Sequence, residues 1–263
     1  MKKYLVIGSP IDHSLSPKLH NHWIKKNNIK AIYEKKKIKE NEIKKLISEL
    51  REGKLDGINV TIPFKKSVIP FIDQLSLQAK EAKSVNTVYL ENNKVLGHNT
   101  DITGFELAIR KIAFNVKGKK IFILGAGGVV SSIILSLKKM GAAKIILSNR
   151  TKKKAEDIKN NFNDLELINW GETPEFDMVI NATSLGLKEE DEIKLNYEKI
   201  GSNKLFYDVI YNPKKTRFLL KAKQFGNKIE NGKMMFIYQA HQSFTLWHKI
   251  MPKIDEETIR LLD

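Results

Sequence analysis

Short apolar runs bounded by turn residues dominate the first hundred residues and predict β-strands. These runs cover residues 2–8, 31–37, 56–62, 85–90 and 94–97. Apolar residues at helical spacing predict helices over 16–28, with Ser16 as the N-cap, and over 41–52. The N-terminal part of the chain therefore predicts a small α/β unit.

From residue 101 onward, buried strands and helices alternate. The predicted strands are residues 119–124, 144–148, 177–181 and 205–210. The predicted helices are residues 101–118, 128–140 and 152–162, and the tail 233–262 is typical of two more. Such alternation predicts a doubly wound parallel sheet with helices on both faces.

These patterns predict an α/β protein of two domains. Residues 1–100 and 233–263 are expected to form an N-terminal α/β domain that binds substrate. Residues 101–232 are expected to form a Rossmann-like dinucleotide-binding domain. The carboxyl ends of its strands should hold the ligand, and small or polar residues follow each of them.

A glycine turn, Gly125–Gly128, follows the first strand of this second domain and opens a helix. Gly125 permits the tight turn, and Gly127 lets the backbone approach a pyrophosphate at the helix N-terminus. The third position of the usual fingerprint is Val130 rather than Gly or Ala. A plain strand-to-helix turn is the alternative interpretation of this segment.

The next strand ends in Asn149 and Arg150, and Arg150 indicates which dinucleotide binds. An acidic residue there would bind a free ribose 2′-hydroxyl, whereas Arg accommodates a 2′-phosphate. The sequence therefore predicts NADP(H) as cofactor. Lys152 and Lys153 fit the solvated first turn of the next helix better, and Lys154 fits either role.

Composition excludes several other classes. The 263 residues carry a formal charge of +16, but nearly all of it is lysine interleaved with acids, and no nucleic-acid-recognition pattern is present. No apolar run reaches membrane-spanning length, and the chain has no cysteine. We expect a cytoplasmic protein, as monomer or homodimer, with no nucleic-acid, membrane or metal partner.

Polar side chains of the N-terminal domain suggest a site for an anionic substrate. Ser14 and Ser16 precede a helix and could bind a carboxylate, although simple capping by Ser16 explains them as well. Lys65 follows the strand over 56–62, which Pro63 breaks, and could transfer a proton, unless it is an ordinary surface lysine. Asp101 adds a carboxylate.

Taken in order, these segments resemble shikimate dehydrogenases along nearly the whole chain. The matching motifs are Ser14–Ser16, Asn59–Lys65, Ser84–Thr87, Gly97–Asp101, Gly125–Gly128, Asn149–Thr151, Asn181–Ser184, Tyr211–Pro213 and Gln239–Ala240. The resemblance implies that NADPH reduces the C3 ketone of 3-dehydroshikimate to give shikimate, a step toward chorismate and the aromatic amino acids.

The resemblance also implies roles for individual residues. Lys65 would be the acid/base group, paired with Asp101. The substrate-binding residues would be Ser14 and Ser16 at the carboxylate, Tyr211 over that end, and Thr61, Asn86, Asp101 and Gln239 at the ring hydroxyls. The cofactor-binding residues would be Gly125, Ala126, Gly127, Gly128, Val129, Asn149, Arg150, Thr151, Lys154, Thr183, Val209 and Gly232.

Three other functions stay open at this stage. A quinate/shikimate dehydrogenase of broader specificity often uses NAD, which Arg150 disfavours. A regulatory module that lost the chemistry is expected to lack Lys65 or Asp101. A folate-type NADP dehydrogenase would not explain Ser14 and Ser16. The domain crossings near residues 101 and 230 are the expected hinges.

Overall fold

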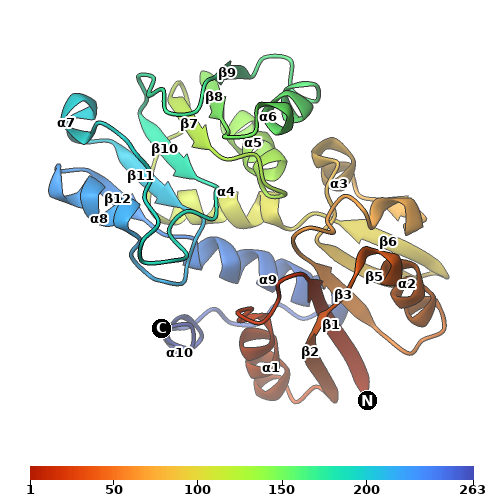
Figure 1. The fold of residues 1–263 in the computed structure, drawn as a ribbon. Helices are drawn as coiled ribbons and strands as arrows, with labels where there is room; N and C mark the ends of the chain where they lie inside the picture. The colour runs from red at the N-terminus through yellow and green to blue at the C-terminus, as the bar shows by residue number, and fades with distance from the viewer. The chain divides into compact units, whose positions relative to one another are not determined.

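The computed structural model describes all residues, Met1–Asp263, which divide into two compact units (Figure 1). The first unit contains Met1–Phe105 and Ile237–Asp263, and the second contains Glu106–Phe236. The boundaries lie inside α4 (Asp101–Lys111) and α9 (Lys233–His248). The chain therefore passes from one unit to the other within a helix each time.

A mixed six-stranded sheet in the order β2-β1-β3-β5-β6-β4 is the centre of the first unit. Its strands are β1 (Lys2–Gly8), β2 (Ala31–Lys37), β3 (Gly57–Val60), β4 (Gln74–Leu75), β5 (Thr87–Glu91) and β6 (Lys94–His98). Strands β2, β1 and β3 are parallel, whereas β5 runs antiparallel to both β3 and β6. Asn92 and Asn93 close the β5–β6 hairpin with the positive φ angles that a two-residue loop favours.

Helices cover both faces of this sheet. The side chains of β1 point alternately to the two faces and pack against helices on each. Leu5 and Ile7 pack into one apolar cluster with Leu46 and its neighbours on α2 (Ile43–Arg51). On the other face, Tyr4 stacks on Trp247 of α9, with 4.9 Å between ring centroids. The remaining helices of the unit are α1 (Ser16–Lys26), α3 (Leu77–Ala82), α10 (Glu256–Arg260) and the short 3₁₀ turns Glu40–Glu42 and Ile69–Phe71.

An all-parallel sheet in the order β12-β11-β10-β7-β8-β9 is the centre of the second unit. Its strands are β7 (Lys120–Leu124), β8 (Lys144–Ser148), β9 (Glu166–Ile168), β10 (Met178–Asn181), β11 (Leu205–Asp208) and β12 (Lys228–Glu230). The strand order reverses between β7 and β10, as in doubly wound dinucleotide-binding sheets. The predicted two-domain α/β fold with a doubly wound parallel sheet is confirmed.

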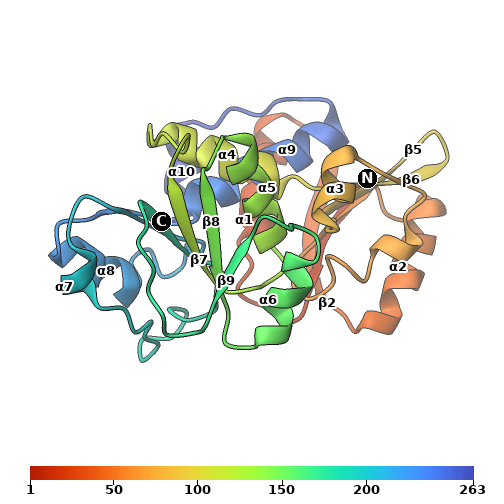
Figure 2. The same ribbon diagram turned by 90° about the horizontal axis from the view of Figure 1, so that it is seen from above.

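Helices lie on both sides of this parallel sheet. Figure 2 shows α7 (Tyr197–Ile200) and α8 (Arg217–Gln224) to one side of the strands and α5 (Val130–Lys139) to the other. On the side of α7 and α8, Tyr197 and Phe218 pack into one apolar cluster with Phe122 and Phe206 of the strands. The remaining helix, α6 (Lys152–Lys159), packs along β8 and β9.

Some local predictions were wrong or incomplete. Ser16 is the first residue of α1 and not its N-cap: Leu15 takes the cap position, and no side chain caps this helix. The helix predicted over 101–118 ends at Lys111, since Ala113 has a φ of +53°. The elements that we did not predict are short: β4, β9, β12, α3, α7 and α8.

Replacing Leu46 should test how far the first unit depends on the face of α2. Leu46 is 1% exposed, so Leu46→Ala removes buried methyl groups and leaves a cavity. We expect a loss of about 2–5 kcal/mol in the free energy of unfolding, measured by urea denaturation. The exposed neighbour Lys45→Ala should change it by less than about 0.5 kcal/mol. Equal effects of the two substitutions would contradict this packing.

Candidate active site

The topology of the first unit gathers its polar motifs at one edge of the sheet. Strands β1, β3 and β6 end at this edge, and β5, which runs the opposite way, begins there. The side chains predicted to bind substrate follow or precede these strand ends: Ser14, Ser16, Thr61, Lys65, Asn86 and Asp101. Gln239 joins them from α9.

A buried ion pair lies at the centre of this edge. Lys65 Nζ is 2.5 Å from Asp101 Oδ2, and the two residues are 8% and 5% exposed. Lys65 comes from the turn that follows β3, and Asp101 is the first residue of α4. The lysine is therefore not an ordinary surface residue, because nearly all the other lysine ion pairs of the chain are solvent-exposed.

Asn86 binds the carboxylate oxygen of Asp101 that does not contact Lys65. Its Nδ2 donates to Asp101 Oδ1 at 2.9 Å and to Thr100 Oγ1 at 2.9 Å, while its Oδ1 accepts from the Thr100 N–H. Gln239 Oε1 lies 3.5 Å from the same Nδ2. Since Asn99 Oδ1 accepts the N–H of Asp101, the first turn of α4 is fixed as well. The position of Lys65 Nζ thus depends on an ordered set of polar partners.

Asn59 is the centre of a second buried set that the sequence analysis did not single out. Its Nδ2 donates to Asn86 O, Thr87 Oγ1 and Ser243 Oγ at 3.0–3.1 Å. Its Oδ1 accepts from the Tyr33 hydroxyl at 2.7 Å. The only signal in the sequence was an amide in the middle of an apolar strand, which is expensive to bury unless every polar atom is bonded.

Tyr33 connects Asn59 to the serine pair. The Ser16 side chain bonds to the Tyr33 hydroxyl. Because the Tyr33 proton goes to Asn59, Ser16 must donate its own proton to Tyr33 in this arrangement. Burial raises the pKa of Tyr33 well above its usual value, so the ring stays neutral. A continuous set of hydrogen bonds therefore runs from Ser16 through Tyr33, Asn59 and Asn86 to Asp101.

Ser14 and Thr61 lie beside this set in different ways. The Ser14 hydroxyl accepts the N–H of Ser16 at 3.3 Å, and its proton stays available for a ligand. Thr61 follows β3 and lies close to Gly8 at the end of β1, where an added Cβ would be 2.5 Å from Thr61 Cγ2. Both side chains are partly exposed, as ligand contacts require.

In the second unit, the predicted cofactor residues follow the carboxyl ends of the parallel strands. Gly125, directly after β7, has a φ of +106°, and a Cβ there would be 2.7 Å from Ala182 O. Asn149, after β8, accepts the N–H of Ala126 and donates to Thr151 O. Asn149 thus ties the glycine turn to the end of the second strand.

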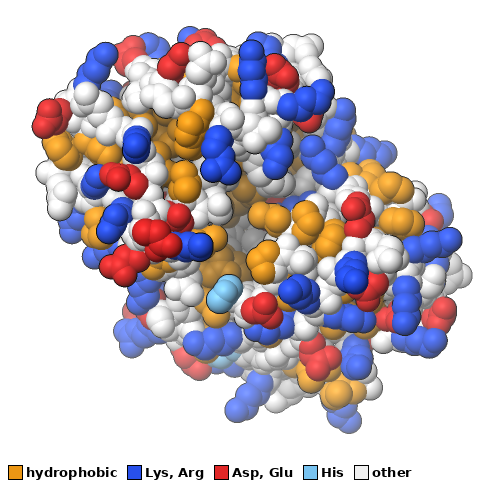
Figure 3. All heavy atoms as spheres, viewed as in Figure 1, with side chains coloured by type: hydrophobic (Ala, Val, Ile, Leu, Met, Phe, Trp, Pro, Cys, Tyr) orange, Lys and Arg blue, Asp and Glu red, His pale blue; other side chains and the backbone are white.

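The glycine turn and the start of α6 offer the groups that a dinucleotide phosphate needs. No acceptor within the chain bonds the N–H groups of Gly127 and Val129, which lie just before α5. Arg150 and Lys154 are exposed and form no ion pair. Figure 3 shows Lys and Arg side chains gathered over this part of the second unit. These features fit a pyrophosphate at the turn and a 2′-phosphate near Arg150.

Two further predicted residues depend on a close backbone approach. A Cβ on Gly232 would be 2.0 Å from Val209 O, so no other residue fits at this position. The N–H of Val209 donates to Asn181 O, which fixes the position of Val209.

Tyr211 stacks on Phe236 with 4.6 Å between ring centroids. Tyr211 is therefore placed by the second unit, whereas the other predicted substrate residues belong to the first.

Asp208 is a buried carboxylate beneath the cofactor loops that the sequence analysis did not assign to the site. It accepts from Asn181 Nδ2, Ile210 N–H and Thr216 Oγ1 at 2.6–3.0 Å. Asn181 Oδ1 in turn accepts from the N–H and the hydroxyl of Thr183. Burial raises the pKa of Asp208 to about 6, and the three donors lower it only in part. Asp208 thereby joins the loops that follow β10 and β11.

Two observations bear on other classes of site. His22, Asp255 and Glu257 place one ligand atom each within 4.8 Å of one another, but Lys26 Nζ already binds both carboxylates at 3.0 and 2.6 Å. None of the helices is both long enough and apolar enough to span a bilayer.

The raised pKa of Asp208 predicts a pH dependence of stability. The folded protein binds this proton more tightly than the unfolded chain, so the contribution is full below pH 4 and is lost as pH rises toward 6. Asp208→Asn removes the titrating group. We expect its free energy of unfolding to gain about 3 kcal/mol relative to the unmodified protein between pH 4 and pH 7. Urea denaturation across that range measures the difference, and parallel curves would contradict the assignment.

Comparisons with known proteins match both units of the chain. The family model described as shikimate dehydrogenase substrate binding domain matches residues 6–88, and the model described as shikimate / quinate 5-dehydrogenase matches residues 106–209. The chain is 60% identical to a shikimate dehydrogenase (NADP(+)) of Pelagibacter ubique strain HTCC1062 over 262 residues, which is 100% of this chain and 99% of that relative.

Solved structures show the same similarity in three dimensions. Shikimate dehydrogenase from Aquifex aeolicus superimposes with a TM-score of 0.90 at 37% identity, covering 100% of this chain and 97% of that one. Shikimate 5-dehydrogenase from Thermus thermophilus, in complex with NADP(H) and shikimate, gives a TM-score of 0.90 at 28% identity over 100% of both chains. The chain belongs to the shikimate dehydrogenase family.

Proposed function

We propose that this protein catalyses the reversible, NADPH-dependent reduction of 3-dehydroshikimate to shikimate. The observation that carries the proposal is the buried Lys65–Asp101 pair, held by Asn86 at the sheet edge where the other predicted substrate residues lie. The names of the relatives agree in both substrate and cofactor. The first unit would bind the substrate and the second unit the cofactor.

In this proposal, Lys65 controls the proton of the reaction. NADPH, when bound, supplies the hydride that reduces the substrate ketone. Negative charge then develops on the ketone oxygen and must be met by a proton or a positive group. Lys65 Nζ can donate that proton, and Asp101 keeps the ammonium group in place. In the reverse direction the same nitrogen accepts the proton of the shikimate hydroxyl.

Neighbouring side chains would orient the substrate. Ser14 and Ser16 would bind its carboxylate, which requires Ser16 to move its proton from Tyr33 to the ligand. Thr61, Asn86, Asp101 and Gln239 would bind ring hydroxyls, and Tyr211 would cover the carboxylate end. Buried polar groups of this kind reject a substrate that lacks the matching hydroxyl, because they would then be left without a partner.

The cofactor would be held by the loops of the second unit. Gly125–Val129 would receive the pyrophosphate, while Asn149, Arg150, Thr151 and Lys154 would surround the 2′-phosphate. Thr183, Val209 and Gly232 would contact the remainder of the dinucleotide. Arg150 offers a planar set of donors that suits phosphate, and Lys154 adds a point charge.

The most direct test measures NADP reduction with shikimate, with NAD and quinate in parallel assays. Turnover with NADP and shikimate alone supports the proposal. Comparable turnover with NAD or quinate would instead favour a quinate/shikimate dehydrogenase of broader specificity. Binding of NADP and shikimate without turnover would favour a regulatory module.

Replacing Lys65 should separate proton transfer from binding. We expect Lys65→Met to lower kcat about 10²–10⁴-fold and to change the KM for shikimate far less, because the lost interaction forms mainly in the transition state. Asp101→Asn should impair both constants, since Asp101 also contacts the substrate. The adjacent exposed Lys66→Met is the matched control and should leave both unchanged. A raised KM at unchanged kcat would make Lys65 a binding group.

Replacing Arg150 should lower the preference for NADP. A charge-assisted bond to phosphate contributes about 1.5–3 kcal/mol, so Arg150→Ala should reduce kcat/KM for NADP by about 10–100-fold. The value for NAD should stay the same, because NAD has no 2′-phosphate. Lys159→Ala, an exposed cation at the far end of α6, provides the control. A parallel loss for NAD and NADP would show that Arg150 acts on the fold instead.

A further inference from the structure

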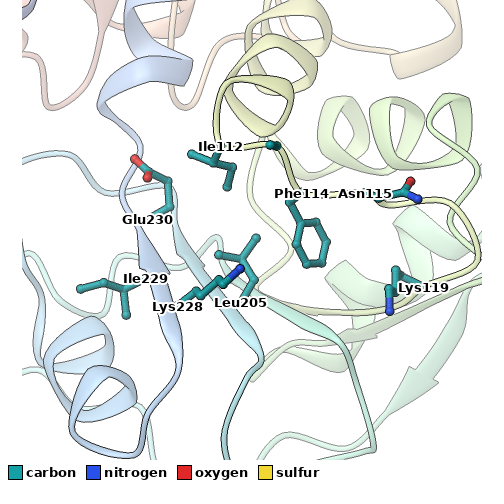
Figure 4. A pocket seen from close by; sticks show the side chains of 9 residues that line it. Ile112, Phe114, Asn115, Lys119, Leu205, Lys228, Ile229 and Glu230 are labelled. Carbon is teal, nitrogen blue, oxygen red and sulfur yellow. The ribbon is translucent and has the colours of Figure 1, made fainter.

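A cavity of about 460 Å³ lies in the second unit, at the edge of the sheet opposite the cofactor loops. Its walls come from the segment that follows α4, from Lys119 before β7, from the first residue of β11 and from all three residues of β12 (Figure 4). The volume lies within the range of small-molecule sites. The proposed dehydrogenase reaction uses none of its residues.

The inner wall of the cavity is apolar. Figure 4 shows Ile112, the ring of Phe114 and Leu205 bordering one central space. Ile112 and Phe114 are only partly buried although both are large and apolar. An apolar group of a ligand would remove this surface from water, which is favourable.

Two opposite charges border the same space without an ion pair. Lys228 and Glu230 are two residues apart on β12 and so share a face, whereas Ile229 packs into the core from the other face. Lys119 on the same rim, by contrast, binds Asp177 at 3.4 Å. Burial raises the pKa of Glu230, and the N–H of Asn231 and the charge of Lys111 lower it only in part. Burial of the Glu230 carboxylate is thus compensated only in part, and a ligand ammonium would add to the compensation.

We propose that this cavity binds a free α-amino acid with a large apolar side chain. Its carboxylate would bind Lys228, its ammonium would bind Glu230, and its side chain would pack on Ile112, Phe114 and Leu205. Alternate residues of a strand are about 7 Å apart, so two long side chains can converge on the adjacent charged groups of one amino acid.

Other ligand classes satisfy fewer of these groups. A carboxylic acid without an amine leaves Glu230 unpaired, and an amine without a carboxylate leaves Lys228 unpaired. A phosphate-bearing ligand would have one unpaired lysine to bind and would face the Glu230 carboxylate. The arrangement of charges therefore favours the zwitterion.

The test is an NMR titration of the ¹⁵N-labelled full chain with L-phenylalanine up to about 20 mM. 3-Phenylpropionate and 2-phenylethylamine, which each lack one charged group, are titrated in parallel. We expect saturable shifts at the backbone of residues 112–115 and 228–230 with L-phenylalanine. We expect each analogue to bind at least about tenfold more weakly, since one charged contact to the chain is lost.

Two variants assign the charged contacts. Glu230→Gln should weaken L-phenylalanine about tenfold and leave 3-phenylpropionate unchanged, whereas Lys228→Met should weaken both carboxylates. Lys223→Met, an exposed lysine of α8 outside the cavity, is the control and should bind as the unmodified chain does. Thermal melting and turnover with shikimate and NADP verify that each variant is folded.

Three results would overturn the proposal: no saturation with L-phenylalanine, equal affinity for L-phenylalanine and 3-phenylpropionate, or shifts confined to residues 125–129. If the unmodified chain showed no dehydrogenase activity, that result would contradict the proposed function but not this amino-acid site, because binding is measured without turnover.

Discussion

The first unit depends on one costly feature, the burial of the charges of Lys65 and Asp101. Two ions removed from water are tolerated only when their remaining donors and acceptors are bonded as well. Asn86 meets this requirement for the second oxygen of Asp101, and Asn99 fixes the backbone from which Asp101 projects. The arrangement of polar residues at the sheet edge follows from this requirement.

The need to bond every buried polar group also involves residues deeper in the unit, which contact no ligand in the proposal. Asn86 is held by Thr100, and its carbonyl accepts from Asn59. Asn59 is satisfied by Ser243 of α9 and by Tyr33 of β2. Strands and a helix that are far apart in sequence are thereby joined by side-chain amides, and the orientation of Ser16 is linked to that of Lys65.

The sequence alone predicted the features that local rules determine. A glycine after a buried strand and an arginine after the next one lie within single turns, so their meaning does not depend on distant contacts. Fold class was predicted from such local patterns and the family from the resemblance of the ordered motifs, and both are confirmed. The roles of the individual site residues, among them Lys65 and Arg150, stay predictions.

Features that depend on long-range contacts could not be predicted. Asn59 acquires its importance only when Ser243, 184 residues later, bonds to it. Ser16 looked like a helix cap, but it lies inside α1 and its side chain bonds to Tyr33 of β2 instead. Strands β9 and β12 have three residues each, too few for a periodic pattern, and the parallel sheet of the second unit stabilises them. Helix α8 did carry a signal, because Thr216 caps it and apolar residues recur at helical spacing.

Lys65 and Arg150 show why the two units use different types of cationic side chain. Lys65 is buried against one carboxylate, and the proposed reaction needs an amine that gives up and regains a proton, which a guanidinium does not do. Arg150 is exposed at the end of β8 without an ion pair, and a permanently charged planar group keeps its donors arranged for a phosphate. Exchanging the two types would place a fixed charge where the proposed reaction needs a mobile proton, and a single point charge where the proposed phosphate site needs several parallel donors. In both units, the exposure of the cation and the choice of side chain are therefore consistent with the proposed roles.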